Sequence, residues 1–154
     1  MKTFALCATT LLLAAPVLAQ EEATVTMDEV PPTVMEAALA EKLGAADFTA
    51  VAMDQGVYEF SGSTDDGLGY EVDVMEDGTV EEVEKEIPAE ALPAQVAATL
   101  EAELAGFTPD YVEESTRADG MIVYEFEGTH EGAAIDAEIA ADGTGFAMND
   151  DLAG

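Results

Sequence analysis

Val57-Tyr58-Glu59-Phe60-Ser61-Gly62 returns 66 residues later as Val123-Tyr124-Glu125-Phe126-Glu127-Gly128, and this recurring stretch decides the fold. Side chains alternate between the two faces of an extended strand, so the Tyr and the Phe of each copy share one face. Each copy therefore predicts a strand with one aromatic face.

The segment before the first copy predicts an amphipathic helix. Pro31 and Pro32 fit its start, because the first turn has backbone N–H groups without an intrahelical partner. Asp28 is a candidate cap. Glycine can take the left-handed conformation that ends helices, so the helix is expected to end near Gly44. Apolar residues at four-residue spacing form its buried stripe; they are Met35, Leu39 and Leu43, with Val34 and Ala38 beside them.

Four short antiparallel strands are expected after the helix, over residues 48–53, 57–61, 70–75 and 79–83. The third strand alternates apolar with acidic residues, as a sheet with one wet face requires. Asp65-Asp66-Gly67 and Glu76-Asp77-Gly78 predict hairpin turns, because glycine accepts positive φ. The acidic run 81–86 is expected to finish the fourth strand at a sheet edge, where charge discourages edge-to-edge association.

The same elements recur in the same order in the second part of the chain. The helix stripe recurs at an offset of 61 and the alternating strand at an offset of 65. Pro93 matches Pro32; Val96, Leu100 and Leu104 match Met35, Leu39 and Leu43; Tyr111 matches Phe48; Ile135, Ala137 and Ile139 match Tyr70, Val72 and Val74; Asp142-Gly143-Thr144 matches Asp77-Gly78-Thr79. Gly106 is expected to end the second helix, and Phe146 with Met148 to give the last strand a buried face.

This recurrence predicts an α+β fold of two tandem repeats, residues 30–87 and 88–149. Each repeat is expected to pack one helix on an antiparallel sheet of about four strands. A unit of about 60 residues is marginal alone. The two repeats are therefore expected to share their buried surface, either as one continuous sheet or as two sheets that meet.

The repeated unit resembles the PepSY and PepSY-like families of bacterial exported proteins and peptidase propeptides, over about Val30 to Met148. The resemblance rests on the proline-led helix ending in Gly, the Val-Tyr-Glu-Phe strand, the acidic alternating strand and the Asp-Gly-Thr turn. It implies a helix on an antiparallel sheet, a tandem layout similar to that of β-lactamase inhibitory protein, and a role in restraining peptidases or other envelope enzymes. It carries over no catalytic residues. The chain departs from the inhibitor comparison in having no Trp, whereas tight interfaces are rich in Trp, Tyr and Arg.

Residues 1–19 have the pattern of a cleaved signal peptide. Lys2 precedes an apolar stretch, and Val17-Leu18-Ala19 resembles a signal-peptidase site. The alternative is an uncleaved anchor, although the apolar stretch is shorter than the roughly 20 residues that a spanning helix needs. Cleavage removes the single cysteine, Cys7, which favours an exported protein held by its core alone and a periplasmic location. Residues 20–29 are expected to form a flexible lead-in and residues 150–154 a tail.

The mature chain is strongly acidic. All 34 Asp and Glu residues remain against Lys42, Lys85 and Arg117, which leaves a formal net charge of −31. Such a surface repels nucleic acid and anionic lipid, so neither partner is expected. Adaptation to a saline environment is one explanation of the charge, and low-affinity cation (calcium) binding or buffering is the alternative.

The chain contains little that predicts catalysis. His130, on a predicted hairpin loop, is a candidate base or metal ligand, with a solvated turn residue as the alternative; a base needs a positioned partner. The Asp-Gly segments lack EF-hand spacing, the methionines are scattered, and no phosphate-binding loop is present. We therefore expect no catalytic residue, cofactor or metal. The leading hypothesis is a non-enzymatic binding module that contacts an envelope protein through its sheet or its loops.

Overall fold

A computed structural model describes residues 23–42 and 47–148 of the 154-residue chain. The expected signal peptide, the helix end near Gly44 and the tail after residue 149 lie outside the described residues. Within the described part, no helix is long and apolar enough to cross a membrane.

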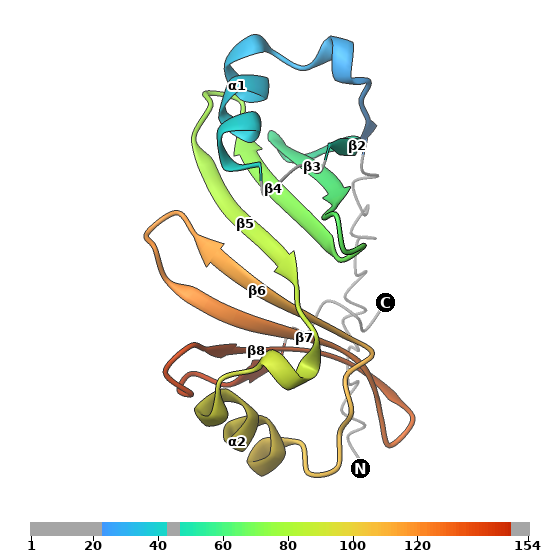
Figure 1. Cartoon of the computed structure of the whole chain (residues 1–154), viewed down its shortest axis with the longest axis vertical. Helices are drawn as coiled ribbons and strands as arrows, with labels where there is room; N and C mark the ends of the chain where they lie inside the picture. The colour runs from blue at the N-terminus through green and yellow to red at the C-terminus, as the bar shows by residue number, and fades with distance from the viewer. Residues whose placement is uncertain (1–22, 43–46, 149–154) are drawn as a thin grey trace, which may run out of the picture.

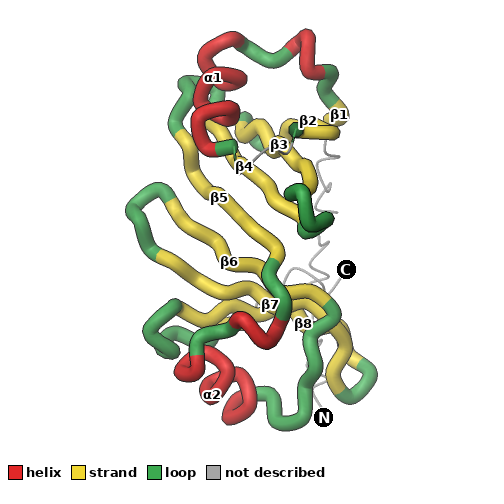
Figure 2. The backbone as a smooth tube through the Cα atoms, in the orientation of Figure 1, coloured by secondary structure: helices red, strands yellow, loops and turns green. Residues whose placement is uncertain are grey.

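The described residues form an α+β fold with one antiparallel sheet of nine strands and two α-helices. The order of the strands in the sheet follows their order in the chain. The helices lie at opposite ends of the molecule, and the strands run as a continuous band between them (Figures 1 and 2). The strands are β1 (Ala23–Thr24), β2 (Phe48–Asp54), β3 (Val57–Ser63), β4 (Gly69–Met75), β5 (Val80–Glu86), β6 (Tyr111–Arg117), β7 (Ile122–His130), β8 (Ala133–Ala140) and β9 (Ala147–Met148). The helices are α1 (Pro32–Glu41) and α2 (Ala94–Glu103), each preceded by a 3₁₀ turn, η1 (Met27–Glu29) and η2 (Ala89–Ala91).

The predicted Asp-Gly turns are confirmed. Gly67, Gly78 and Gly143 all have positive φ, which glycine adopts without a steric penalty. The aspartates hold the turns from inside: Asp77 Oδ1 accepts a hydrogen bond from the Thr79 N–H, and Asp142 Oδ1 accepts one from the Thr144 N–H, each at 2.9 Å. Their carboxylates are therefore used by the turns themselves.

One of the two expected arrangements, a continuous sheet, is confirmed. The buried apolar residues nevertheless form two clusters rather than one, so the expectation that the repeats share their buried surface is wrong. One cluster belongs to residues 23–86, which we call the N-terminal half, and the other to residues 87–148, the C-terminal half. Helix α1 packs on β4 and β5, and α2 packs on β8. Since each helix covers its own end of the long sheet, the halves are joined through the sheet instead.

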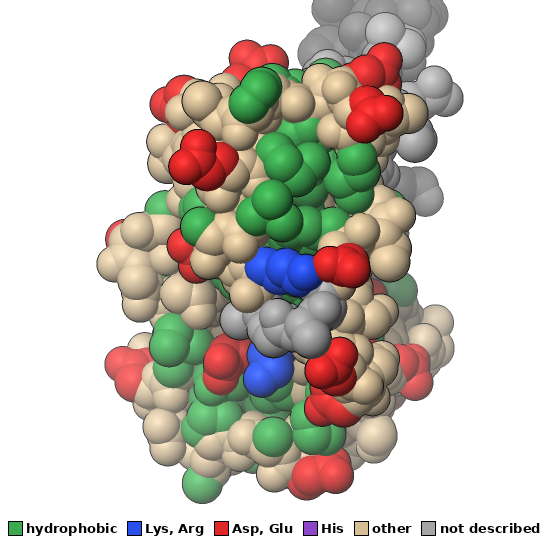
Figure 3. Space-filling model, turned by 45° about the horizontal axis from the view of Figure 1, so that its top comes forward, with side chains coloured by type: hydrophobic (Ala, Val, Ile, Leu, Met, Phe, Trp, Pro, Cys, Tyr) green, Lys and Arg blue, Asp and Glu red, His purple; other side chains and the backbone are tan. Residues whose placement is uncertain are grey.

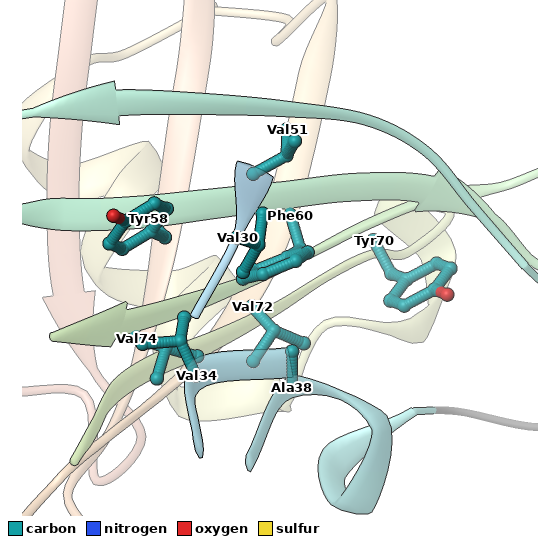
Figure 4. Packing of buried hydrophobic residues seen from close by; sticks show 9 residues of the cluster. All are labelled: Val30, Val34, Ala38, Val51, Tyr58, Phe60, Tyr70, Val72 and Val74. Carbon is teal, nitrogen blue, oxygen red and sulfur yellow. The ribbon is translucent and has the colours of Figure 1, made fainter. Parts of the chain in front are cut away.

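The buried stripe of α1 is shifted by one residue from the prediction. Val34 and Ala38 are fully buried, whereas Leu39 is 52% exposed. Figure 4 shows Val34 and Ala38 pointing from the helix toward Val72 and Val74 on the sheet. The helix therefore approaches the sheet with its smaller side chains. In α2 the predicted Val96 and Leu100 are buried.

The N-terminal segment differs from the sequence-based expectation. Part of the expected lead-in has regular structure, since β1 pairs with β2 and residues 27–29 form a 3₁₀ turn. Asp28 does not cap α1. Instead, Thr26 and Glu29 form a capping box around the 3₁₀ turn, and Pro31 stands at the N-cap of α1.

Strand β5 lies at the centre of the sheet, not at an edge. It pairs with β4 on one side and with β6 on the other. The strand was expected at an edge because sequence spacing does not show whether two units share one sheet. The edges are instead the two-residue strands β1 and β9. Met148, which was expected to be buried in the last strand, is 41% exposed.

Candidate functional site

The candidate site is the face of the sheet that points away from the helices, where β5 and β6 meet. Alternation along β5 places Val83 with the helix-side core and Glu82 and Glu84 on the opposite face. In the ladder with β6, Glu82 lies opposite Arg117 and Glu84 lies opposite Ser115. The acidic run predicted as an edge signal therefore places carboxylates in the middle of the molecule.

Neighbouring strands add further carboxylates to this face. On the β4 side, Glu71 lies opposite Glu84 and Asp73 opposite Glu82. On the other side, register pairs bring acidic residues of β6, β7 and β8 into one row. We call the resulting group the carboxylate cluster; it comprises Glu71, Asp73, Glu82, Glu84, Glu113, Glu125 and Glu138.

Arg117 is the cation of the carboxylate cluster. Its Nε lies 3.2 Å from Glu82 Oε1, and its Nη2 lies 2.6 Å from Glu138 Oε2 and 3.4 Å from Glu125 Oε1. One guanidinium thus links carboxylates on β5, β7 and β8. The fixed fork of five N–H donors makes arginine suited to such a role. In the space-filling view acidic side chains are spread over the surface, whereas Lys and Arg side chains are sparse (Figure 3).

A buried hydroxyl supports the same contact between strands. Ser115 is fully buried and donates a short hydrogen bond to Glu82 Oε1. The same oxygen accepts the Arg117 Nε–H. Glu82 is therefore held by two donors from β6.

Glu84 lies between these groups with a different environment. The ion pairs of Arg117 go to Glu82, Glu125 and Glu138, and not to Glu84. Burial, and after it the nearby charges of Glu113, Glu125 and Glu71, together raise the pKa of Glu84 to about 9. Desolvation and like charges both disfavour the ionised form, so Glu84 holds a proton at neutral pH.

Other members of the carboxylate cluster have raised pKa values for the same reasons. Burial, with the charge of Glu71, raises the pKa of Asp73 to about 7. Burial raises the pKa of Glu125 to about 7 as well, although Arg117 opposes this shift. Burial also raises the pKa of Glu113. Asp73 Oδ1 is buried and has no hydrogen-bond partner within the described part of the chain.

Three of these carboxylates lie close enough to surround a small cation. Oxygens of Glu82, Glu84 and Glu125 all lie within 4.8 Å of one another. Two of the three, however, are already paired with Arg117, and Glu84 favours its protonated form. The Arg117 guanidinium supplies the positive charge that a metal ion would supply. We therefore assign no metal to the cluster.

His130 lies at the end of β7 rather than in the predicted loop. The turn that follows is Glu131-Gly132, where both residues have positive φ. The imidazole packs edge-on against Phe107, with ring centroids 5.9 Å apart. No described carboxylate pairs with His130, so the structure does not bring it together with a residue that could orient a catalytic base.

A small recess lies on the helix side of the same junction. It has a volume of about 200 Å³ and is lined by residues of both halves. Glu41, Val80 and Val83 come from the N-terminal half, and Thr116, Arg117 and Ala118 from the C-terminal half. The two halves therefore leave unfilled space where they meet on this side.

Sequence reasoning did not identify the carboxylate cluster. The alternation of acidic residues at 82, 84 and 86 with Val83 was visible in the sequence. The missing information was the pairing of β5 with β6, which brings residues more than 30 positions apart into contact. Arg117 is the only arginine of the sequence, and that rarity in a chain with 34 acidic residues was the available signal.

The fold defines an α+β protein with a single antiparallel sheet, and solved structures share it. A scan against protein-family models and a search of the curated proteins give no match. The chain is similar to the crystal structure of a DUF2874 family protein from Bacteroides ovatus ATCC 8483, with a TM-score of 0.62 and 12% identity, over 80% of this chain and 93% of that one. It is also similar to a DUF2874 family protein from Bacteroides uniformis ATCC 8492, with a TM-score of 0.65 and 15% identity, over 77% of this chain and 88% of that one. Identities this low show a common fold alone.

Proposed function

We propose that this chain is an exported, non-enzymatic, PepSY-like binding module whose helix-free sheet face docks on an envelope protein. A peptidase or another envelope enzyme is the proposed partner, restrained by the contact. The observation that carries the proposal is the carboxylate cluster, which spans strands of both halves. Positive charges on a partner would offset the repulsion among these carboxylates. A basic surface is therefore the electrostatic complement of this face.

The proposal includes an origin by duplication of one helix-and-sheet unit. Three comparisons between the halves support it. The helices begin 62 residues apart, one more than the offset predicted from the sequence. Phe60 and Phe126 are both fully buried, and Tyr58 and Tyr124 nearly so.

The third comparison concerns the glycines of the Asp-Gly turns. In each half the turn glycine packs against the start of the helix: Gly78 lies against Thr33, and Gly143 against Gln95. A repeated contact between a turn and a helix is harder to explain by chance than a repeated strand.

Capture from a periplasmic extract at moderate salt tests the function. Glu127 is exposed on the proposed binding face, so Glu127→Lys is expected to lower recovery of the partner severalfold. Glu103→Lys, an equal change of charge on exposed α2, is the matched control and is expected to bind as the unchanged protein does. Failure to recover any partner at several salt concentrations, or equal loss with both variants, would count against the proposal.

The proposal also assigns the chain no catalytic activity. The packing of His130 against Phe107, without a carboxylate partner among the described residues, supports this assignment. A hydrolase screen with peptide and ester substrates, run beside His130→Ala, is the direct test. A turnover rate abolished in that variant would contradict it.

The second candidate function is low-affinity cation binding or buffering, with calcium as the first ion to test. The observation in its favour is the number of carboxylates on one face against a single arginine. Here the ions would be held loosely over the face, without a fixed ligand set. Calorimetry with calcium and magnesium in excess sodium separates the two functions. Stoichiometric binding heats that remain in excess sodium favour cation binding. Heats that disappear when sodium is added exclude it.

A further inference from the structure

The junction between the halves lies between two separate apolar clusters. Each half has its own buried cluster, with no residue in common. The ladder between them pairs residues 82–86 with residues 113–117, and the recess of about 200 Å³ lies on its helix side. Contacts of this kind allow two bodies to move relative to each other.

On the opposite side of the same ladder, Glu84 lies opposite Ser115 and among carboxyl groups that come from both halves. Glu84 reaches this side from β5, and the carboxyl groups of Glu113 and Glu125 face it from β6 and β7. Arg117 compensates Glu82, Glu125 and Glu138, but it gives Glu84 no ion pair. A negative charge on Glu84 would therefore repel charges of both halves at once.

We propose that the β5–β6 ladder is a charge-operated hinge, which stays closed while Glu84 is protonated and opens between the two halves when Glu84 ionises. The inference concerns the chain itself and does not depend on the proposed binding partner. Hinges of this type place the moving contact at a few residues while the bodies on either side stay intact.

The charged and titratable groups that face Glu84 come from every strand near it. They are Glu71 and Asp73 on β4, Glu82 and Glu86 on β5, Tyr111, Glu113 and Arg117 on β6, Glu125 and Glu127 on β7, and Glu138 on β8. Most of them are acidic, so ionisation of Glu84 adds charge to an already negative group. The raised pKa of Glu84, about 9, places the opening in mildly alkaline solution.

Hydrogen exchange of the full chain, expressed as protection factors at pH 6 and pH 9.5, tests the hinge. The reference is the β3–β4 ladder, which lies within one half. The ratio of protection at residues 82–86 and 113–117 to that at residues 57–63 and 69–75 is expected to fall about tenfold at pH 9.5. Glu84→Gln, which is neutral and nearly isosteric, is expected to keep the ratio constant. Glu90→Gln, an exposed change of equal charge, is expected to behave as the unchanged protein does.

The outcomes separate a hinge from general instability. A uniform loss of protection in both ladders, no loss at all, or a loss that persists in Glu84→Gln overturns the proposal. A second measurement follows the distance between labels on Leu39→Cys of α1 and Glu103→Cys of α2, with Cys7→Ser removing the native thiol. A longer and broader distance at pH 9.5 that Glu84→Gln abolishes supports the hinge; a distance independent of pH overturns it.

Discussion

Ser115 on β6 donates its hydroxyl hydrogen bond to Glu82 on β5, so a fully buried side chain of one half holds a carboxylate of the other. Tyrosines aside, Ser115 is the only polar or charged residue among those described that is buried as a whole. Buried polar groups are costly unless they are paired. The two halves are therefore joined by a side-chain hydrogen bond as well as by the backbone hydrogen bonds of the β5–β6 ladder.

Replacement of Ser115 by alanine is expected to lower the free energy of unfolding by about 1–3 kcal/mol. This is the range for the loss of a hydrogen bond to a charged group and for a buried acceptor left without its donor. Urea denaturation followed by circular dichroism measures the loss. Ser63→Ala, at an exposed strand end, is the matched control, with an expected change within about 0.5 kcal/mol. Equal effects of the two variants would show that the hydroxyl contributes nothing to stability.

Arg117→Gln tests the guanidinium as the cation of the carboxylate cluster. It is expected to cost about 2 kcal/mol at pH 8, since charge-assisted hydrogen bonds to three carboxylates are lost from a partly exposed site. The cost is expected to shrink at pH 5, where the uncompensated carboxyls can take up protons. Unfolding curves at the two pH values provide the measurement, and Lys85→Gln, at an exposed position of β5, is the control. A cost that is independent of pH would contradict the role.

Asp73→Asn tests the pH dependence of stability. The pKa of Asp73 in the folded protein, about 7, lies above its ordinary value, so the folded state binds more protons than the unfolded state between about pH 4 and pH 7. Stability is thus expected to fall as pH rises through this window. The asparagine variant should be more stable than the unchanged protein by about 1 kcal/mol at pH 8, after solvent screening is allowed for, and no more stable at pH 4.

Thermal unfolding across pH 4 to 8 measures this difference. Asp65→Asn, at an exposed turn, removes the same charge without the burial and serves as the control. A constant difference between Asp73→Asn and the unchanged protein across the window would show that Asp73 does not titrate there.

Phe60→Ala and Phe126→Ala test the separation of the two cores. Each ring is fully buried, so each variant is expected to lose about 3–5 kcal/mol. Because the rings lie in different clusters, their effects should add in the double variant to within about 0.5 kcal/mol. Double-mutant analysis of urea unfolding gives the coupling, and Leu39→Ala, at an exposed position, is the control. A larger coupling would mean that the cores act as one.

Much of the fold could be predicted because the relevant signals are local. Alternation in residues 70–75 and the Asp-Gly turns depend on neighbours in the chain, and both are present in the structure. The side of a helix that faces the sheet is not local. Val34 and Ala38, and not Leu39, join a cluster whose other members include Val72 and Val74, from a strand that follows the helix.

The candidate site could not be predicted from local sequence patterns, because its residues are distant in the sequence. Glu84 and Glu125 lie 41 residues apart in the sequence, and they meet because the fourth strand of one predicted unit pairs with the first strand of the next. Sequence similarity also misled at one pair of positions. Tyr111 was matched to Phe48. However, the Phe48 ring packs at a tilt against Phe60 at the core, whereas the Tyr111 hydroxyl donates to Glu113 on the acidic face.

The order of the sheet has a consequence for how the protein acquires its structure. Since strands that follow one another in the chain are also neighbours in space, most pairings close only a short turn. The pairing of β5 with β6 is different, because it closes the connection over residues 87–110 that contains α2. Topologies dominated by nearby contacts fold faster than those that join distant segments. Such a sheet can therefore form strand by strand from either end. An intermediate that stops partway is a smaller antiparallel sheet with native strand pairing.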